Sequence, residues 1–190
     1  MPAAMERFFN TAGPCQPAYH YMLPPERRVP TVRGLVEQMH YFVIHAPRQT
    51  GKTTALQTLA SRLTEEGRYA AVLVSAEQGQ AFEDDIDRAE TAMLGAWASA
   101  AKVLPAQLRP PAWPPAPAGD RIRAALEAWA EHCPRPLVVF IDESDALRGP
   151  TLISMLRQLR SGHRLRPEHF PWSVALIGLR DVRDYVESDT

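Results

Sequence analysis

The chain has 190 residues, with 21 lysines and arginines against 22 aspartates and glutamates. This length suits one domain, or most of one, with a sizeable core. The balanced charge excludes a general attraction to nucleic acid or acidic membranes, so such a partner would need a local patch. Two distant cysteines exclude a disulfide scaffold, and the sequence shows neither a signal peptide nor a bilayer-length apolar run. We therefore expect a soluble cytoplasmic protein with no membrane partner.

The 18 prolines gather in two places and set the predicted domain organisation. Residues 1–30 are expected to form an irregular arm packed on the core, and residues 31–190 to form the core itself. Within the core, residues 105–119 read PAQLRPPAWPPAPAG and predict a surface excursion of polyproline-like conformation. A passive connector is the favoured reading of this excursion, ahead of a ligand for a proline-binding module.

Apolar runs of strand length alternate with amphipathic segments along the core. The expected strands are residues 41–46, 69–76, 137–141 and 173–178. The expected helices are residues 31–40, 53–67, about 80–103, 120–133 and 151–162. The first strand, YFVIHA, has the continuous apolar character of a strand buried on both faces. This alternation predicts a three-layer α/β fold around a mostly parallel sheet.

A phosphate-binding loop is indicated by APRQTGKT, residues 46–53, between the first strand and a helix. Backbone N–H groups of such a loop face phosphates, and the lysine reaches the β and γ phosphates while the next hydroxyl faces Mg²⁺. The expected ATP contacts are Ala46, Pro47, Arg48, Gln49, Thr50, Gly51, Lys52, Thr53 and Thr54. Ala46 replaces the usual first glycine, which is tolerable if its φ stays negative. The alternative is an ordinary helix capped by Thr50, with Lys52 solvated.

An acidic strand end follows in LVVFIDESDAL. Adjacent side chains at a strand end diverge, so Asp142 is expected to bind Mg²⁺ while Glu143 orients and deprotonates the attacking water. The alternative is a polar turn that caps the next helix, and for Asp145 capping is the better reading.

Arg180 is a weaker candidate at the end of the fourth strand, where it could touch the γ phosphate. A salt bridge with Asp181 or Asp184 explains it equally well. His45, beside the loop, is expected to support the site or the core ahead of acting as a catalyst.

Four arginines in RQLRSGHRLR, namely Arg157, Arg160, Arg164 and Arg166, lie near a predicted helix C-terminus. The helix dipole favours cations there, which is the default explanation. One of them could instead reach a neighbouring subunit's nucleotide, or the group could bind nucleic acid, and the sequence does not choose. The four tryptophans are expected to be core or loop anchors.

With these residues placed, the chain resembles bacterial AAA-type ATPases of the P-loop superfamily, particularly a group whose loop reads HAPRQTGKT. The likeness covers nearly the whole chain, through the segments FFNTAGP, YFVIHAPRQTGKTT, FIDESDAL, ISMLRQLRSG and GLRDVRDY. It implies nucleotide and metal contacts from Lys52 and Thr53, an acidic pair in Asp142 and Glu143, Arg180 near the sensor position, and an arm near the adenine.

The resemblance also implies parts that the sequence does not display. Such ATPases have a fifth parallel strand and a helical lid, whereas we identify four strands and no lid, and expect an N-terminal portion or a shortened form.

The leading functional hypothesis is Mg-dependent ATP hydrolysis, with catalytic Glu143, Lys52 and Arg180, that drives conformational change in a protein partner or homo-oligomer. One alternative is a nucleotide-binding module with little turnover. Another is a small phosphate-loop kinase, which would have no need of a water-activating glutamate.

Overall fold

The computed structural model describes residues 6–11, 18–21, 29–45 and 51–178. Its centre is a four-stranded, fully parallel sheet in the order β1-β4-β3-β2. The strands are β1 (Tyr41–His45), β2 (Ala70–Ser75), β3 (Leu137–Asp142) and β4 (Ser173–Gly178). Each predicted strand is therefore present, and the predicted parallel α/β architecture is confirmed.

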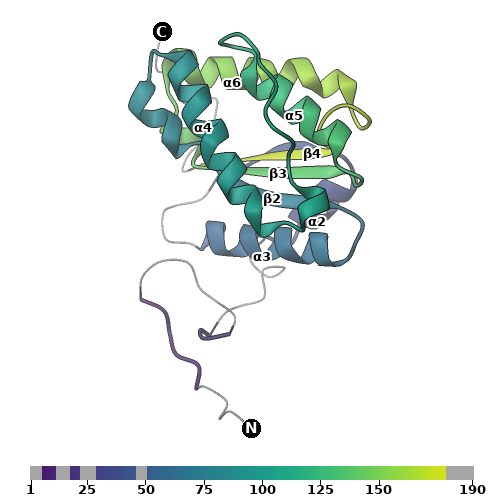
Figure 1. The fold of residues 1–190 in the computed structure, drawn as a ribbon. Coiled ribbons are helices and arrows are strands. Elements are labelled where there is room, and N and C mark those ends of the chain that lie inside the picture. The colour runs from purple at the N-terminus through teal and green to yellow at the C-terminus, as the bar shows by residue number, and fades with distance from the viewer. Residues whose placement is uncertain (1–5, 12–17, 22–28, 46–50, 179–190) are drawn as a thin grey trace.

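Helices cover both faces of this sheet, as Figure 1 shows. The α-helices of the described core are α2 (Val32–Glu37), α3 (Lys52–Glu65), α4 (Ile86–Ala100), α5 (Arg121–His132) and α6 (Gly149–Gly162). In the view of Figure 1, α4, α5 and α6 lie above the sheet, and α2 and α3 lie on its other side. Among the described residues, no helix has both the length and the apolar character needed to cross a membrane.

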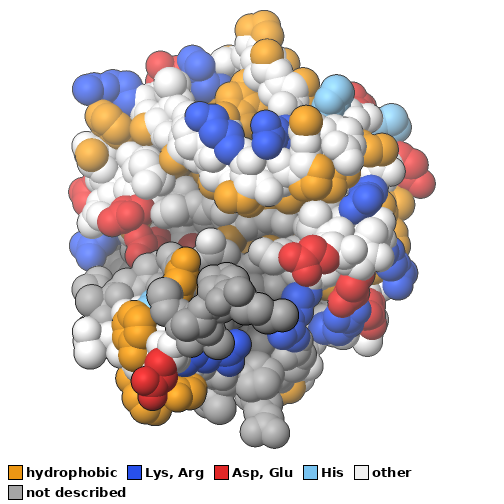
Figure 2. All heavy atoms as spheres, turned by 60° about the horizontal axis from the view of Figure 1, so that its bottom comes forward, with side chains coloured by type: hydrophobic (Ala, Val, Ile, Leu, Met, Phe, Trp, Pro, Cys, Tyr) orange, Lys and Arg blue, Asp and Glu red, His pale blue; other side chains and the backbone are white. Residues whose placement is uncertain are grey.

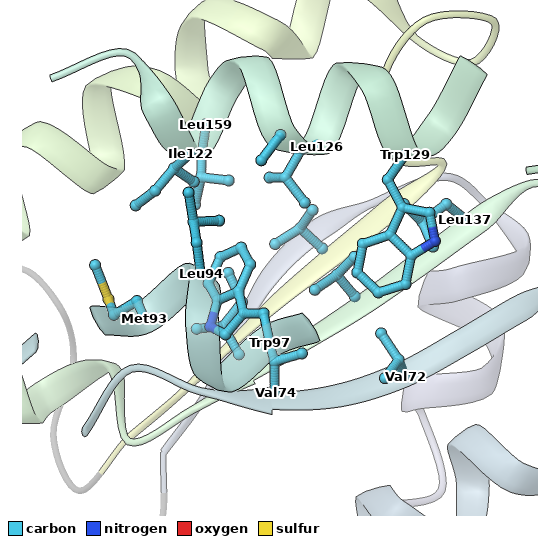
Figure 3. Close-up of a cluster of buried hydrophobic side chains, with 14 of the residues drawn as sticks. Val72, Val74, Met93, Leu94, Trp97, Ile122, Leu126, Trp129, Leu137 and Leu159 are labelled. Atoms are coloured by element: carbon cyan, nitrogen blue, oxygen red, sulfur yellow. The ribbon is translucent and has the colours of Figure 1, made fainter. Parts of the chain in front are cut away.

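Alternate residues of the inner strands enter two separate cores. On β3, Leu137, Val139 and Ile141 join the core shared with α4, α5 and α6, and Val138 and Phe140 join the core shared with α2 and α3. The first core is built around the buried rings of Trp97 and Trp129, drawn in Figure 3. Continuous apolar strands are what a sheet covered on both faces requires.

The first strand differs from its prediction. We expected YFVIHA to be buried on both faces, which is wrong for β1, because the sheet order places it at an edge next to β4 alone among the described strands. Val43 is 40% exposed, and His45 is exposed as well. Apolar composition therefore predicted the strand correctly but did not predict its edge position in the sheet.

The predicted long helix at about residues 80–103 is divided. A 3₁₀ segment, Glu77–Phe82, precedes α4, and the Asp85 side chain begins α4 by accepting a hydrogen bond from the Arg88 N–H at 3.1 Å. Satisfying this otherwise unpaired N–H stabilises a helix start at this point. A second 3₁₀ turn, Ala101–Val103, follows α4.

The proline-rich excursion is anchored to the helices rather than loose. Leu108 is fully buried at the end of a 3₁₀ turn, Ala106–Leu108, and its carbonyl accepts a hydrogen bond from the Trp129 indole at 3.0 Å. The Trp113 indole donates to the Leu94 carbonyl at 3.0 Å. At the far end the Gly119 N–H donates to the buried Glu90 carboxylate at 3.0 Å. These contacts hold the segment against α4 and α5.

The described part of the N-terminal arm holds itself together through aromatic pairs. Phe8 forms a parallel bridge with His20, and their rings meet edge to face at 4.8 Å. Phe9 pairs with Tyr21 at 5.0 Å and is 78% exposed. Packing of the whole arm on the core stays a prediction.

The end of α6 is shaped by a close approach. A side chain at Gly162 would place its Cβ 2.2 Å from the buried Phe170 ring. No residue larger than glycine fits there without displacing the ring. The predicted helix end at Gly162 is confirmed, and the lack of space explains why this residue is a glycine.

Candidate functional site

The carboxyl ends of the four strands meet at one edge of the sheet. His45 is opposite Gly178, and Ser75 is opposite Asp142, so the last residues of all four strands lie along this edge. The segment that joins β1 to α3 starts from the same edge. In parallel α/β sheets this is where ligands bind.

Helix α3 begins at this edge with a glycine in a left-handed conformation. Gly51 has φ 77° and ψ 23°, a region that side-chain-bearing residues rarely adopt. No side-chain hydrogen bond caps this helix start among the described residues. The N–H groups of the first turn, from Lys52 onward, have no acceptor within the helix. Such a start is suited to an anion.

Thr53 and Asp142 come together although 89 positions separate them. The Thr53 hydroxyl donates to Asp142 Oδ2 at 2.7 Å, and the Glu143 N–H donates to Asp142 Oδ1 at 3.0 Å. Asp142 is only 7% exposed. Both of its oxygens are therefore oriented by hydrogen bonds, one from the start of α3 and one from its own strand end.

Glu143 stands beside Asp142 in a strained backbone conformation. Its φ is 54° and ψ is 36°, which costs free energy for a residue with a side chain. Partial burial of the carboxyl group, followed by the negative charges of Glu77 and Asp142, raises the pKa of Glu143 above its ordinary value.

Glu77 was missed by the sequence reasoning. It begins the 3₁₀ segment after β2, and its carboxyl group lies near enough to that of Glu143 to raise the pKa of Glu143. The neighbouring Ala76 N–H donates to the Asp142 carbonyl at 2.9 Å, which continues the β2–β3 pairing past the strand end. The only signal was a carboxylate two positions beyond a strand whose end adjoins that of β3.

The turn after Glu143 is tied to the end of β4. The Ser144 hydroxyl donates to the Ile177 carbonyl at 3.0 Å. Asp145 lies so close that a Cβ at Gly178 would be 3.1 Å from its Oδ1. Helix α6 has its N-cap at Arg148, without a side-chain cap, so the expected capping role of Asp145 is wrong.

The predicted site residues divide into three groups. Gly51, Lys52, Thr53, Thr54, Asp142 and Glu143 lie at this edge of the sheet. Ala46, Pro47, Arg48, Gln49, Thr50 and Arg180 lie outside the described residues. The arginine cluster belongs to neither group, because α6 starts near this edge and ends near Phe170, which precedes the opposite end of β4.

The comparison with protein families decides the fold family. A family described as AAA domain matches residues 37–186, which is most of the chain. The chain belongs to the AAA domain family. No protein of curated function matches the chain. The AAA domain seen here is accordingly a P-loop nucleotide-binding domain, with the start of α3 and the acidic end of β3 at one edge of its sheet.

Proposed function

We propose that this AAA domain binds Mg-ATP at the carboxyl edge of its sheet and hydrolyses it to move a partner or an assembly. The observation that carries the proposal is the 2.7 Å hydrogen bond between the Thr53 hydroxyl and the Asp142 carboxylate. It brings the hydroxyl that follows the loop lysine to the acidic strand end, as the chemistry requires.

The residues present fit such a ligand. Mg²⁺ prefers oxygen donors and is usually held by one or two protein groups together with substrate phosphates. Thr53 and Asp142 supply a hydroxyl and a carboxylate oxygen side by side. The first turn of α3 supplies backbone N–H groups that have no carbonyl acceptor within the helix, and such groups suit phosphate oxygens. A bound metal ion would neutralise negative charge on the phosphates.

Each protein group then has a distinct task. Lys52, the first residue of α3, reaches the terminal phosphates. Asp142 holds the Thr53 hydroxyl and, together with it, would hold the metal ion. Glu143 accepts a proton from the attacking water, for which its carboxyl group must first be ionised.

The test is calorimetric titration with Mg-ATP, followed by phosphate release. Lys52→Ala should abolish binding. The chain has one other lysine, Lys102, which is exposed, and Lys102→Ala is the matched control that should bind as the parent does. Unchanged affinity in Lys52→Ala would show that the nucleotide site is elsewhere.

Hydrolysis is tested separately with Glu143→Gln. This variant should bind Mg-ATP normally and release no phosphate. If the parent protein also binds without releasing phosphate, the domain is a nucleotide-binding module. Transfer of the phosphoryl group to a small metabolite would instead assign a kinase.

A further inference from the structure

A row of exposed arginines runs along α6 and the 3₁₀ turn His163–Leu165 that follows it directly. Arg157 and Arg160 lie on α6 and Arg164 lies in this turn, and in the described part of the chain they make no hydrogen bond, ion pair or ring contact. Positions i, i+3 and i+7 stay on about the same face as the chain continues from the α-helix into the turn. We call these three residues the arginine row.

Several other arginines of the described chain have side-chain partners. Arg33, Arg121 and Arg123 each form an ion pair with a carboxylate. Arg109, Arg135 and Arg166 donate to backbone carbonyls. The arginine row has no such carboxylate or carbonyl partner among the described residues. Residues 146–167 include five arginines and no aspartate or glutamate, so nothing on this stretch neutralises it.

Helix stability explains the row only in part. The helix dipole favours cations within the last turn, where Arg160 lies, but Arg157 lies five positions before the final residue, Gly162. Like charges at i+3 and i+4 spacing on a helix repel each other. Arg157 and Arg160 have the first of these spacings within α6, and Arg164 follows four positions after Arg160 in the 3₁₀ turn, so no member of the row neutralises another.

We propose that the arginine row binds the phosphodiester backbone of duplex nucleic acid. From Arg157 to Arg164 the chain rises about 11 Å along the end of α6 and the following 3₁₀ turn, and each strand of a duplex presents a phosphate about every 3.4 Å along the axis. The row therefore spans about three phosphates. A guanidinium group offers paired N–H donors to phosphate oxygens, which is a strong form of charge-assisted hydrogen bond.

The chemistry of α6 favours a duplex backbone over bases. Single-stranded binding relies on aromatic side chains that stack on bases, and the sequence of α6 has no phenylalanine, tyrosine or tryptophan. The nearby His163 ring is already packed edge to face on Tyr41 at 4.9 Å. Contacts to phosphates alone position a duplex without reading its sequence.

The location of the row separates this binding from nucleotide binding. The arginine row lies toward the C-terminal end of α6, whereas Asp142 and Thr53 lie at the carboxyl edge of the sheet where α6 begins. Figure 2 shows a face of the molecule on which basic and acidic side chains are interspersed and do not separate by charge. The inference goes beyond the proposed ATPase activity, and either one can fail without the other.

The experiment is fluorescence anisotropy with a labelled 20-base-pair duplex of arbitrary sequence across a range of NaCl concentrations. Three phosphate contacts predict a slope of log K against log salt of about −2.7, equivalent to about 40-fold weaker binding between 50 and 200 mM salt. The triple variant Arg157→Gln, Arg160→Gln, Arg164→Gln should lose this dependence and bind at least about tenfold more weakly at low salt.

Two controls make the result specific. Arg148→Gln removes an exposed arginine from the N-cap of the same helix, nine positions and so half a turn away from Arg157, and should leave binding unchanged. The triple lysine variant should keep most of the salt dependence, because counterion release follows charge. The triple glutamine variant should unfold in urea at a midpoint no lower than that of the parent, which shows that it is folded.

Three outcomes would overturn the proposal. One is an unchanged slope in the triple glutamine variant, and another is equal loss in Arg148→Gln. The third is arginine-dependent binding of polyglutamate with no binding of the duplex, which would assign the row to an acidic protein.

Discussion

The two ends of the same four strands use polar groups in opposite ways. At the amino end, Tyr41 donates its hydroxyl to the Pro171 carbonyl at 3.1 Å, and the Arg166 guanidinium lies 4.6 Å from the centre of the Tyr41 ring. Arg166 also donates to the carbonyls of Met39 and Trp172. These donors meet neutral acceptors and join three separate segments of the chain.

At the carboxyl end, groups of the same charge crowd together. Asp142, Glu143 and Glu77 are neighbours, and Glu143 has a left-handed backbone. Such an arrangement destabilises a domain unless a ligand with the opposite charge relieves it. The comparison teaches that the amino end serves stability and the carboxyl end serves binding, and substitutions should separate the two.

The largest expected effect is on stability, from Arg166→Ala. Loss of hydrogen bonds from a charged donor and of the contact with Tyr41 should lower the free energy of unfolding by about 2–3 kcal/mol, measured by urea denaturation. Affinity for Mg-ATP should not change. Arg166→Lys should recover less than half of the loss, because an ammonium group lacks the guanidinium fork. Weaker nucleotide binding with normal stability would break the comparison.

The next effect belongs to the carboxyl end. Asp142→Asn keeps an acceptor for the Glu143 N–H but loses the negative charge that would attract a metal. Affinity for ATP in the presence of Mg²⁺ should fall about tenfold, or about 1.4 kcal/mol, with stability changed by less. The measurement is titration with and without EDTA, and the difference between the two proteins should vanish once the metal is removed. A difference that persists in EDTA would argue against a metal role for Asp142.

A smaller change in stability is expected from Tyr41→Phe. The substitution removes the hydrogen bond to Pro171 but keeps the ring under Arg166. We expect a loss of about 1 kcal/mol by thermal or urea denaturation. Burial raises the pKa of Tyr41 well above its ordinary value, so this contribution should persist through mildly alkaline pH. A loss as large as that of Arg166→Ala would mean that the two residues act as one unit.

The smallest expected effect is a shift of a pH profile. Because the pKa of Glu143 is raised, first by burial and then by Glu77, the base form should accumulate at a higher pH than for an ordinary glutamate. The acid limb of phosphate release should lie correspondingly high, and Glu77→Gln should move it to lower pH.

The same raised pKa fixes the sign of a stability effect. The folded state holds the Glu143 proton more tightly than the unfolded state. The stability gained from this protonated carboxyl group is therefore present below the unfolded pKa and is lost as pH rises through the folded pKa. Glu143→Gln should remove that part of the pH dependence. An acid limb that does not move in Glu77→Gln would show that Glu77 does not act on Glu143.

Much of the fold could be predicted because its signals are local. The apolar run of β3 and the amphipathic segments of α3 and α6 follow from short periodicities, and each is found within a few residues of its expected bounds. The exposed position of β1 could not be predicted in this way. YFVIH and LVVFI are similarly apolar, and the order of strands depends on contacts between distant segments.

The site likewise contains residues that local patterns predict and residues whose position depends on contacts between distant segments. Thr53 and Asp142 were expected to cooperate because a phosphate loop and an acidic strand end each carry a recognisable pattern, and the structure places them in contact. Glu77 carries no pattern, since its proximity to Glu143 depends on β2 lying beside β3. The roles of Arg180 and residues 46–50 stay predictions, because those residues lie outside the described chain.

The contact between Phe170 and Gly162 limits the substitutions that the chain tolerates at these two positions. The ring fills the place where any Cβ at position 162 would be, so a substitution at Gly162 is tolerated only if position 170 becomes smaller at the same time. A smaller residue at 170 alone would leave a cavity in the core. A single substitution at either position therefore costs stability, whereas a paired change can avoid both the clash and the cavity.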